Sequence, residues 1–242
     1  MPNYNKIITQ LEEAYYEILK KTAFSEIYST PNLSGIFLAC PDKSYFESKR
    51  KVLFIGQEPK TWRINCPIKH GADVSREVIK QSMSDTLLQS KMPPGKHKLL
   101  KFYNRCSSEL SELGEESSHS AVYANQFCMS YNRKSPEKSP AFSMISDLSN
   151  QLLKVQFDIL KPDVAIFTTG SARDSHLKSA FIYSDSKVIE PRRLWYFKVN
   201  ETHCFRINHP SARQAIQLDL ERYQNDAIQE AKLCVPILQK KK

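Results

Sequence analysis

The stretch VLFIGQEPK, residues 52–60, begins as a run of apolar residues and ends in a glutamate, a proline and a lysine. A short apolar run bounded by turn residues is typical of a strand that is buried on both faces of a parallel sheet. Ligands of α/β proteins bind at the carboxyl ends of such strands, so a carboxylate at this point indicates chemistry. The stretch predicts a buried strand over 51–55 that leads into a functional loop.

Apolar runs and helical periodicity alternate along the rest of the chain. We expect strands at 121–127, 163–170, 194–199 and 203–207, and helices at 5–22, 97–113, 143–160 and 212–233. This alternation predicts an α/β fold with a mostly parallel sheet. The polar stretch 59–95 has no strong periodicity except around 74–88, and so long an excursion more often has a function than not. No linker divides the chain, so 1–242 is predicted to be one domain: a lead-in over 1–50, a motif-bearing core over 51–213, and a C-terminal helix and basic tail over 214–242.

Composition limits the partners and the location. The 242 residues carry a formal net charge of +9, which favours an acidic partner, either nucleic acid or an anionic membrane surface. No apolar run approaches a membrane-spanning length and the N-terminus does not read as a signal peptide, so we expect a soluble cytoplasmic protein. The six cysteines form no CxxC pair and are expected to be reduced thiols, with no metal. The alternative is that four of them converge in space on a metal or a cluster.

Four of the predicted strands end in or run into polar segments: GQEPK at 56–60, NQF at 125–127, TTGS at 168–171 and NHPSAR at 208–213. Each alone is weak evidence, since a His-Pro-Ser run is often only a capped helix start. Their order, and their shared position at strand ends, carry the functional signal.

In this order the segments resemble the motifs of the uracil-DNA glycosylase superfamily. Residues 56–60 are similar to its water-activating Gly-Gln-Asp-Pro-Tyr motif, and Asn125 matches its base-reading asparagine. The run PPG at 93–95 resembles the proline-rich phosphate loop, TTGSA at 168–172 the tryptophan-glycine-serine turn, and HCFRINHPSAR at 203–213 the strand and His-Pro-Ser-Pro-Leu loop. The resemblance implies a three-layer α/β/α sandwich with a short, mostly parallel central sheet. It also implies a monomeric DNA glycosylase that uses no cofactor.

Some positions depart from the family pattern. Glu58 stands where the best-known branch has aspartate, Lys60 replaces its tyrosine, Gly95 its phosphate-loop serine and Arg213 its wedge leucine. These departures bear on which substrate is used more than on the type of reaction.

The resemblance implies roles for four residues. Glu58 would orient the attacking water and stabilise an oxocarbenium-like sugar. His209 would donate a hydrogen bond to the departing base as a neutral imidazole, and Asn125 would read the base edge of uracil or cytosine. Gln57 would line the pocket through its backbone amide. The alternatives are a solvated loop glutamate, a surface histidine and a turn-forming asparagine.

Extruding a base from the stack requires grips on the DNA backbone. Pro94, the amide of Gly95, Ser171 and Ser211 are the candidate phosphate contacts. Arg213 has three readings: it fills the vacated stack, it binds a phosphate, or it is a surface arginine.

Further residues are candidates for contacts to the base in its pocket. The family's stacking phenylalanine has no clear counterpart; Val74 lies nearest to its position, and Trp62 is the alternative. Lys60 lacks the tyrosine ring that keeps C5 substituents out, so the substrate is expected to be uracil or a C5-modified pyrimidine, such as a hydroxymethylated or glucosylated cytosine of viral DNA. A lysine at this place could also form a Schiff base and add lyase activity.

Two other classes compete with a glycosylase. One is a module on the same fold that binds DNA or an altered base without cleaving it. The other is an unrelated hydrolase or phosphate-binding enzyme, which the lack of a G-x-S-x-G elbow and of a P-loop disfavours.

Overall fold

The protein was analysed as a computed structural model that describes residues 4–61, 74–113, 119–212 and 219–236. The chain forms two compact units, each built from three segments, and each is described by itself. Unit 1 comprises 1–40, 56–91 and 123–160, and unit 2 comprises 41–55, 92–122 and 161–242. The expectation of one domain over 1–242 stays a prediction.

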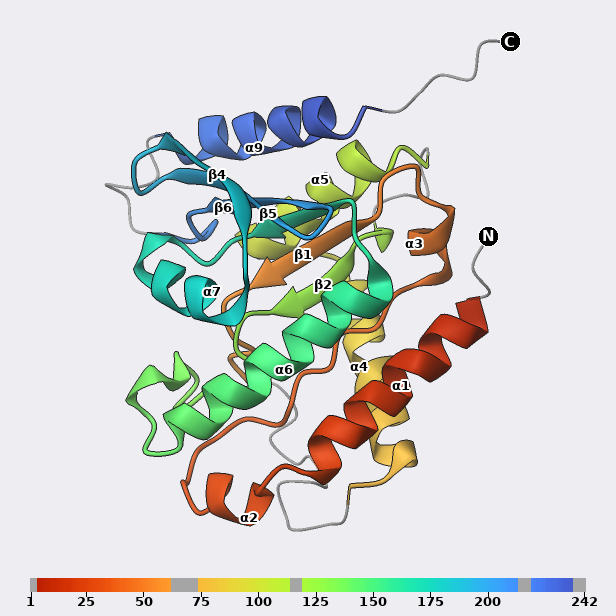
Figure 1. Ribbon diagram of the computed structural model, residues 1–242, viewed down its shortest axis with the longest axis vertical. Coiled ribbons are helices and arrows are strands. Elements are labelled where there is room, and N and C mark those ends of the chain that lie inside the picture. The colour runs from red at the N-terminus through yellow and green to blue at the C-terminus, as the bar shows by residue number, and fades with distance from the viewer. Residues whose placement is uncertain (1–3, 62–73, 114–118, 213–218, 237–242) are drawn as a thin grey trace. The chain divides into compact units, whose positions relative to one another are not determined.

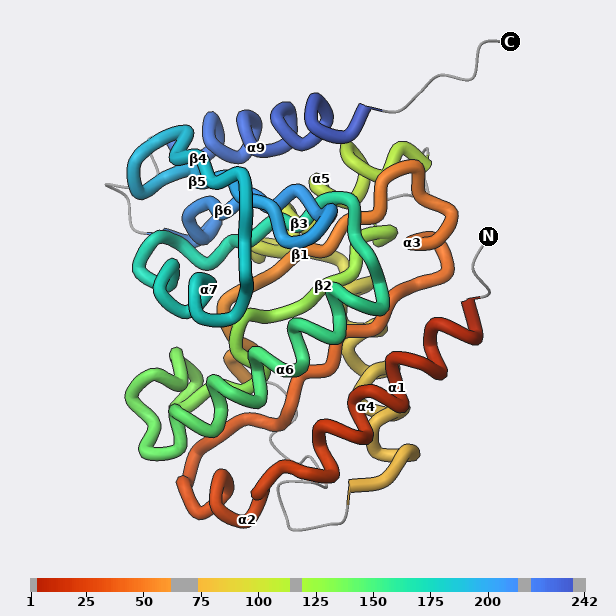
Figure 2. Tube along the Cα trace, viewed as in Figure 1, coloured from red at the N-terminus to blue at the C-terminus, as the bar shows by residue number. Residues whose placement is uncertain are grey.

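The described strands form one six-stranded mixed sheet in the order β2-β1-β3-β6-β5-β4 (Figure 2). Strands β1, β3 and β6 are parallel, whereas β5 and β4 extend the sheet in antiparallel fashion. The predicted α/β class and parallel strands are confirmed; β4 was not predicted, and the hairpin that it forms with β5 makes the sheet mixed. The bounds are β1 Val52–Gly56, β2 Val122–Asn125, β3 Val164–Phe167, β4 Ser184–Glu190, β5 Leu194–Val199 and β6 Thr202–Ile207.

Strand β1 lies between β2 and β3 in the sheet. All of its residues are buried, as a continuous apolar run predicts. The ring of Phe54 packs edge-on against Phe102 and Tyr103 of helix α5 (Lys98–Ser111), with centroid distances of 5.8 and 5.5 Å. Helix α9 (Leu220–Cys234) lies along β6 and α5 (Figure 1). These contacts fix α5 and α9 against the sheet.

The parallel strands of unit 2 end at the same level. Ile55 is aligned with Phe167, and Phe167 with Arg206. The amide and the hydroxyl of Thr168 both donate to the carbonyl oxygen of Ile55, at 2.8 and 3.1 Å. The carboxyl ends of β1, β3 and β6 therefore share one edge, where α/β proteins bind ligands.

Unit 1 is mainly helical. Helix α1 (Tyr4–Lys20) runs beside α6 (Phe142–Leu160) and contacts α4 (Arg76–Ser90) (Figure 2). The predicted helices over 5–22 and 143–160 are confirmed, and the weak periodicity at 74–88 corresponds to α4. A buried segment without regular structure, 33–41, passes these helices. Its carbonyl groups are partly satisfied by side chains, since Tyr15 Oη donates to Ala39 O at 2.9 Å and Ser82 Oγ to Ile36 O at 3.2 Å.

Shorter helices complete the chain. They are α2 Phe24–Ile27, α3 Lys43–Glu47, α7 Asp174–Ala180 and two 3₁₀ turns, Pro136–Lys138 and Ser171–Arg173. Four cysteines are buried free thiols (Cys40, Cys106, Cys128 and Cys204), Cys234 is half-buried, and Cys66 lies outside the described residues. In the part of the chain that the structure describes, no helix is long and apolar enough to cross a membrane.

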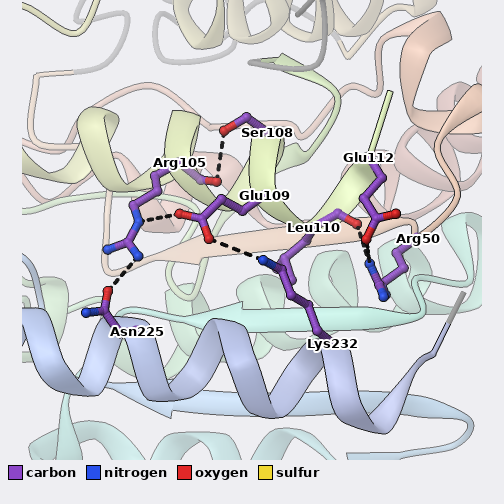
Figure 3. Close-up of polar contacts among 8 residues, drawn as sticks. All are labelled: Arg50, Arg105, Ser108, Glu109, Leu110, Glu112, Asn225 and Lys232. Atoms are coloured by element: carbon purple, nitrogen blue, oxygen red, sulfur yellow. Dashed lines mark hydrogen bonds and ion pairs between the residues drawn. The ribbon is translucent and has the colours of Figure 1, made fainter. Parts of the chain in front are cut away.

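A polar network joins α5 to α9 in unit 2 (Figure 3). The Glu109 carboxylate accepts from Arg105 Nε at 2.6 Å and from Lys232 Nζ at 3.3 Å, and Arg105 also bonds Asn225. The buried Arg50 closes the far end of this interface, since its Nη1 donates to Leu110 O and to Glu112 Oε1. The network holds α5 in a fixed position over β1.

The first prediction concerns Glu109. Burial raises the pKa of this carboxyl, but the hydrogen bond and charge of Arg105, followed by those of Lys232, outweigh it and hold the pKa below its ordinary value. A folded-state pKa below the unfolded value stabilises the fold at pH above the unfolded pKa, and this contribution is lost as pH falls through the folded pKa. We expect Glu109→Gln to lower the free energy of unfolding at pH 7 by about 1 kcal/mol or less, because the pair is partly exposed and screened.

Urea denaturation of both proteins at pH 7 and near pH 3 measures this difference. It should shrink at the lower pH, because the stabilisation is lost as pH falls toward the lowered pKa of the native Glu109 carboxyl. The matched control is Glu26→Gln, at an exposed position in α2, which should not change stability at either pH. An equal loss at both pH values would contradict an electrostatic origin.

Candidate active site

The loop 56–60 after β1 is braced against the segment after β2, within unit 1. Three of its carbonyl oxygens accept hydrogen bonds from that segment. They are Gly56 O from Gln126 N at 2.9 Å, Gln57 O from Phe127 N at 2.9 Å, and Lys60 O from Ser130 Oγ at 3.0 Å. The backbone that carries Glu58 is therefore fixed from both sides.

The side chains of this loop have different surroundings. Glu58 is half-buried and its Oε2 atom is shielded from solvent, whereas Pro59 is buried. The Lys60 side chain is exposed. A carboxylate on a braced loop, partly removed from water, exerts a stronger and better directed field than a solvated one.

Gly56 allows an unusually close approach of two polar side chains from β2. A Cβ atom added to Gly56 would lie 2.6 Å from Asn125 Oδ1 and 2.9 Å from the Tyr123 hydroxyl oxygen. Tyr123 and Asn125 are two residues apart, so they lie on the same face of the strand. Any larger residue at 56 would displace the Asn125 carboxamide.

The carboxamide of Asn125 is buried, with 8% of the residue exposed. Its Oδ1 atom accepts no hydrogen bond from any residue that the structure describes. An unsatisfied buried polar group costs about 1–3 kcal/mol, so its retention points to a use other than stability. The side chain can offer one acceptor and one donor group to a ligand at the end of β1.

In unit 2, the turn after β3 meets the loop after β6. Gly170 has a φ of +75°, which a residue with a side chain rarely adopts. Its amide donates to Ile207 O at 3.0 Å, and a Cβ added to it would lie 3.6 Å from Asn208 Oδ1. Ser171 is thereby held beside the loop that carries His209.

The tautomer of His209 is set by its own loop. The backbone amide of Ser211 donates to His209 Nδ1 at 3.0 Å, and the amide of Ala212 donates to His209 O at 2.8 Å. Because Nδ1 accepts, the proton of the neutral ring resides on Nε2. His209 can therefore donate a hydrogen bond from Nε2 while remaining uncharged.

A buried ion pair lies beneath this half of the site. Arg206, which is 3% exposed, donates from Nη2 to Asp174 Oδ2 at 2.8 Å and from Nη1 to Arg192 O at 3.2 Å. Burial raises the pKa of Asp174 and lowers that of Arg206, although each charge favours the other. The pair joins the first residue of α7 to β6, three residues before His209.

The other predicted residues are more dispersed. Gly95 is exposed with a φ of +48°, in a tight turn where His97 N donates to Pro94 O at 2.8 Å. Ser171 and Val74 are half-buried and Ser211 is exposed, while Trp62 and Arg213 lie outside the described residues. Unit 1 thus brings Gln57, Glu58 and Asn125 together, and unit 2 brings Ser171, His209 and Ser211 together.

Three residues that help to shape these two groups were not predicted from the sequence. They are Tyr123, Asp174 and Arg206. Tyr123 could have been found from its spacing of two residues before Asn125 on a predicted strand. The Arg206–Asp174 pair had no sequence signal, because its partners are far apart in the chain. Among the described residues, no three His, Cys, Asp or Glu side chains are grouped so that they could hold a metal ion.

The second prediction tests whether Asn125 serves stability. Asn125→Leu replaces a buried, unsatisfied amide by an apolar side chain of similar size, so the free energy of unfolding should stay equal or rise by about 1 kcal/mol. Guanidinium denaturation measures this free energy of unfolding. The matched control is Ser149→Ala, which removes a buried hydroxyl that accepts from Cys128 N and donates to Ile145 O. That variant should lose about 1 kcal/mol or more, and a comparable loss in Asn125→Leu would show that the amide is structural.

Comparison with known proteins assigns no family to this chain. No model of a known protein family matches it, and a search of curated proteins found no similar sequence.

Proposed function

We propose that this protein is a DNA glycosylase that hydrolyses the N-glycosidic bond of an extruded pyrimidine, on the three-layer fold of the uracil-DNA glycosylase superfamily. The observation that carries the proposal is the buried, unsatisfied carboxamide of Asn125, held over Gly56 beside the Glu58 loop. A carboxamide carries one acceptor and one donor group, the pair of groups that the edge of a pyrimidine base requires.

Glu58 supplies the charge that the reaction needs. Cleavage of an N-glycosidic bond passes through a sugar with oxocarbenium character, which a nearby carboxylate stabilises while it orients the attacking water. The three hydrogen bonds that brace the loop 56–60 support this role, because a preorganised charge costs no reorganisation during the reaction. No cofactor is required.

His209 stabilises the leaving base. The departing pyrimidine carries negative charge on its carbonyl oxygen, and a neutral imidazole that donates from Nε2 can bind it without adding a proton. The bond from Ser211 N to Nδ1 supports this proposal, because it selects the tautomer that donates from Nε2.

The proposal requires Glu58 and His209 to act on the same nucleotide. The proposed contacts to DNA are Pro94, Gly95, Ser171, Ser211 and Arg213, and the proposed active form is a monomer.

The proposed substrate is uracil or a C5-substituted pyrimidine. The Lys60 side chain is exposed, and only its backbone oxygen is tied down in the described structure, by Ser130. A flexible exposed lysine does not close the pocket beside C5 as a packed tyrosine would, and its ammonium can hydrogen-bond a hydroxylated or glucosylated substituent. Val74 and Trp62 are the proposed residues against the face of the base.

The third prediction concerns Glu58→Gln. Removing one charge that stabilises a transition state costs about 3 kcal/mol, so we expect the single-turnover rate of base release to fall by roughly 100-fold or more. Affinity for the same DNA should change little. Glu58→Asp keeps a carboxylate and should retain more activity than the amide.

The same assay tests whether two groups act together. We expect the double variant Glu58→Gln/His209→Gln to lose less than the product of the two single losses, as for residues that act as a unit. A near wild-type rate in Glu58→Gln would disprove the proposed mechanism. DNA binding without any base release by the wild-type protein would favour a binding module instead.

A further inference from the structure

Unit 2 contains a pocket of about 380 Å³ that the proposed reaction does not use. It lies between the first half of α5, the beginning of α9 and the loop after β6. Pockets of this size accept a phosphate with its sugar. It is lined by Lys98, Lys101, Phe102, Arg105, Pro210, Leu220, Glu221 and Gln224.

The charges of the pocket favour an anion. Lys98, Lys101 and Arg105 follow one another at positions i, i+3 and i+7 of α5, so they lie on one face of the helix. Lys101 is exposed and has no ion-pair partner among the described residues, whereas Arg105 is held in place by Glu109 and Asn225. Glu221 is the single carboxylate in the lining, so the cations outnumber it.

The local backbone adds to this field. Helix α5 begins at Lys98 after His97, whose side chain makes no capping hydrogen bond. The amides of the first turn and the helix dipole therefore present positive charge at the same end of α5 as Lys98 and Lys101. The helix end alone would be weak evidence, but here it opens beside a concave surface that carries three cations.

Part of the pocket lining is apolar. Phe102, Leu220 and Pro210 are buried and belong to this part. A lining that combines cations with apolar atoms suits a sugar-phosphate chain better than a small hydrated ion, because deoxyribose can cover the apolar atoms while phosphate contacts the lysines.

The position of Pro210 relates the pocket to the candidate active site. Pro210 directly follows His209, and consecutive Cα atoms are about 3.8 Å apart. An anion in this pocket is therefore close to the residue proposed to contact the leaving base. A phosphate flanking the extruded nucleotide can reach it along the same DNA strand.

We infer that this pocket binds a backbone phosphate of the DNA strand beside the extruded nucleotide, through Lys98 and Lys101. The identity of the ligand as DNA rests on the proposed function, whereas the preference for phosphate rests on the pocket itself. A free phosphate or a nucleoside monophosphate offers the same chemistry, so the experiment compares these sources.

The fourth prediction is a change in salt dependence. Affinity for a short unmodified DNA duplex is measured by fluorescence anisotropy over a range of salt concentrations. Each phosphate contact contributes about 0.9 to the slope of log K against log salt for a duplex, so losing the one phosphate held by both lysines in Lys98→Gln/Lys101→Gln should reduce the slope by about 0.9. Affinity at low salt should fall about tenfold or more, while base release at saturating DNA stays near the wild-type rate.

Two matched variants test whether a change in net charge or in folding, and not the loss of the pocket lysines, alters DNA affinity. Glu221→Gln removes the pocket's carboxylate and should tighten DNA binding, which misfolding would not do. Lys187→Gln removes an exposed charge from β4, away from the pocket lining, and should leave the slope unchanged.

The outcomes separate the two proposals. An unchanged slope and affinity in Lys98→Gln/Lys101→Gln would overturn the pocket inference while base release still supported the glycosylase. Binding of inorganic phosphate to the same variant is measured by calorimetry. If the variant loses phosphate binding but keeps the wild-type salt slope for DNA, the pocket binds a free phosphate, and its assignment to DNA is overturned. Failure of the wild-type protein to release any base would refute the glycosylase and leave the DNA slope to decide the pocket.

Discussion

The parallel register of β1, β3 and β6 places the loops that follow these strands. It aligns Ile55, Phe167 and Arg206, so the three strands end at one edge. Thr168 holds this register, because its amide and hydroxyl both bond the carbonyl oxygen of Ile55. A shift by one residue would turn every side chain of a strand to the opposite face and would separate the polar loops that follow.

The groups gathered at these loops are not arranged for stability. Asn125 keeps a buried oxygen that accepts no hydrogen bond from any described residue. Gly56 and Gly170 both forgo a side chain, one to admit the carboxamide and the other to turn the chain at a φ of +75°. Functional sites commonly retain such costs, which the rest of the fold must offset.

Much of the fold could be predicted from the sequence because its signals are local. The continuous apolar run predicted β1, and the helical periodicity predicted α1 and α6. Strand β4 was missed because its residues, Ser184–Glu190, are mostly exposed and show no apolar alternation. It forms a strand because it pairs with β5, and this pairing depends on the tertiary fold and not on the local sequence.

The candidate site was predictable as a set of residues but not as a geometry. The polar segments after each strand could be found in the sequence, and Gln57, Glu58 and Asn125 do lie together in unit 1. The hydrogen bond that fixes the His209 tautomer, and the approach of Asn125 to Gly56, depend on contacts that no spacing reveals. Trp62 and Arg213 lie outside the described residues, so their roles stay predictions.

The most direct test of the account is mass analysis of the free bases that the wild-type protein releases from DNA. The substrates are matched duplexes and single strands that contain uracil, thymine, cytosine, 5-hydroxymethylcytosine or its glucosylated form. The account predicts release of a free pyrimidine, either uracil or a C5-substituted base, with an abasic site left in the strand. Absence of any free base from every substrate, by folded protein that binds these DNAs, would contradict the claim that the chain is a glycosylase.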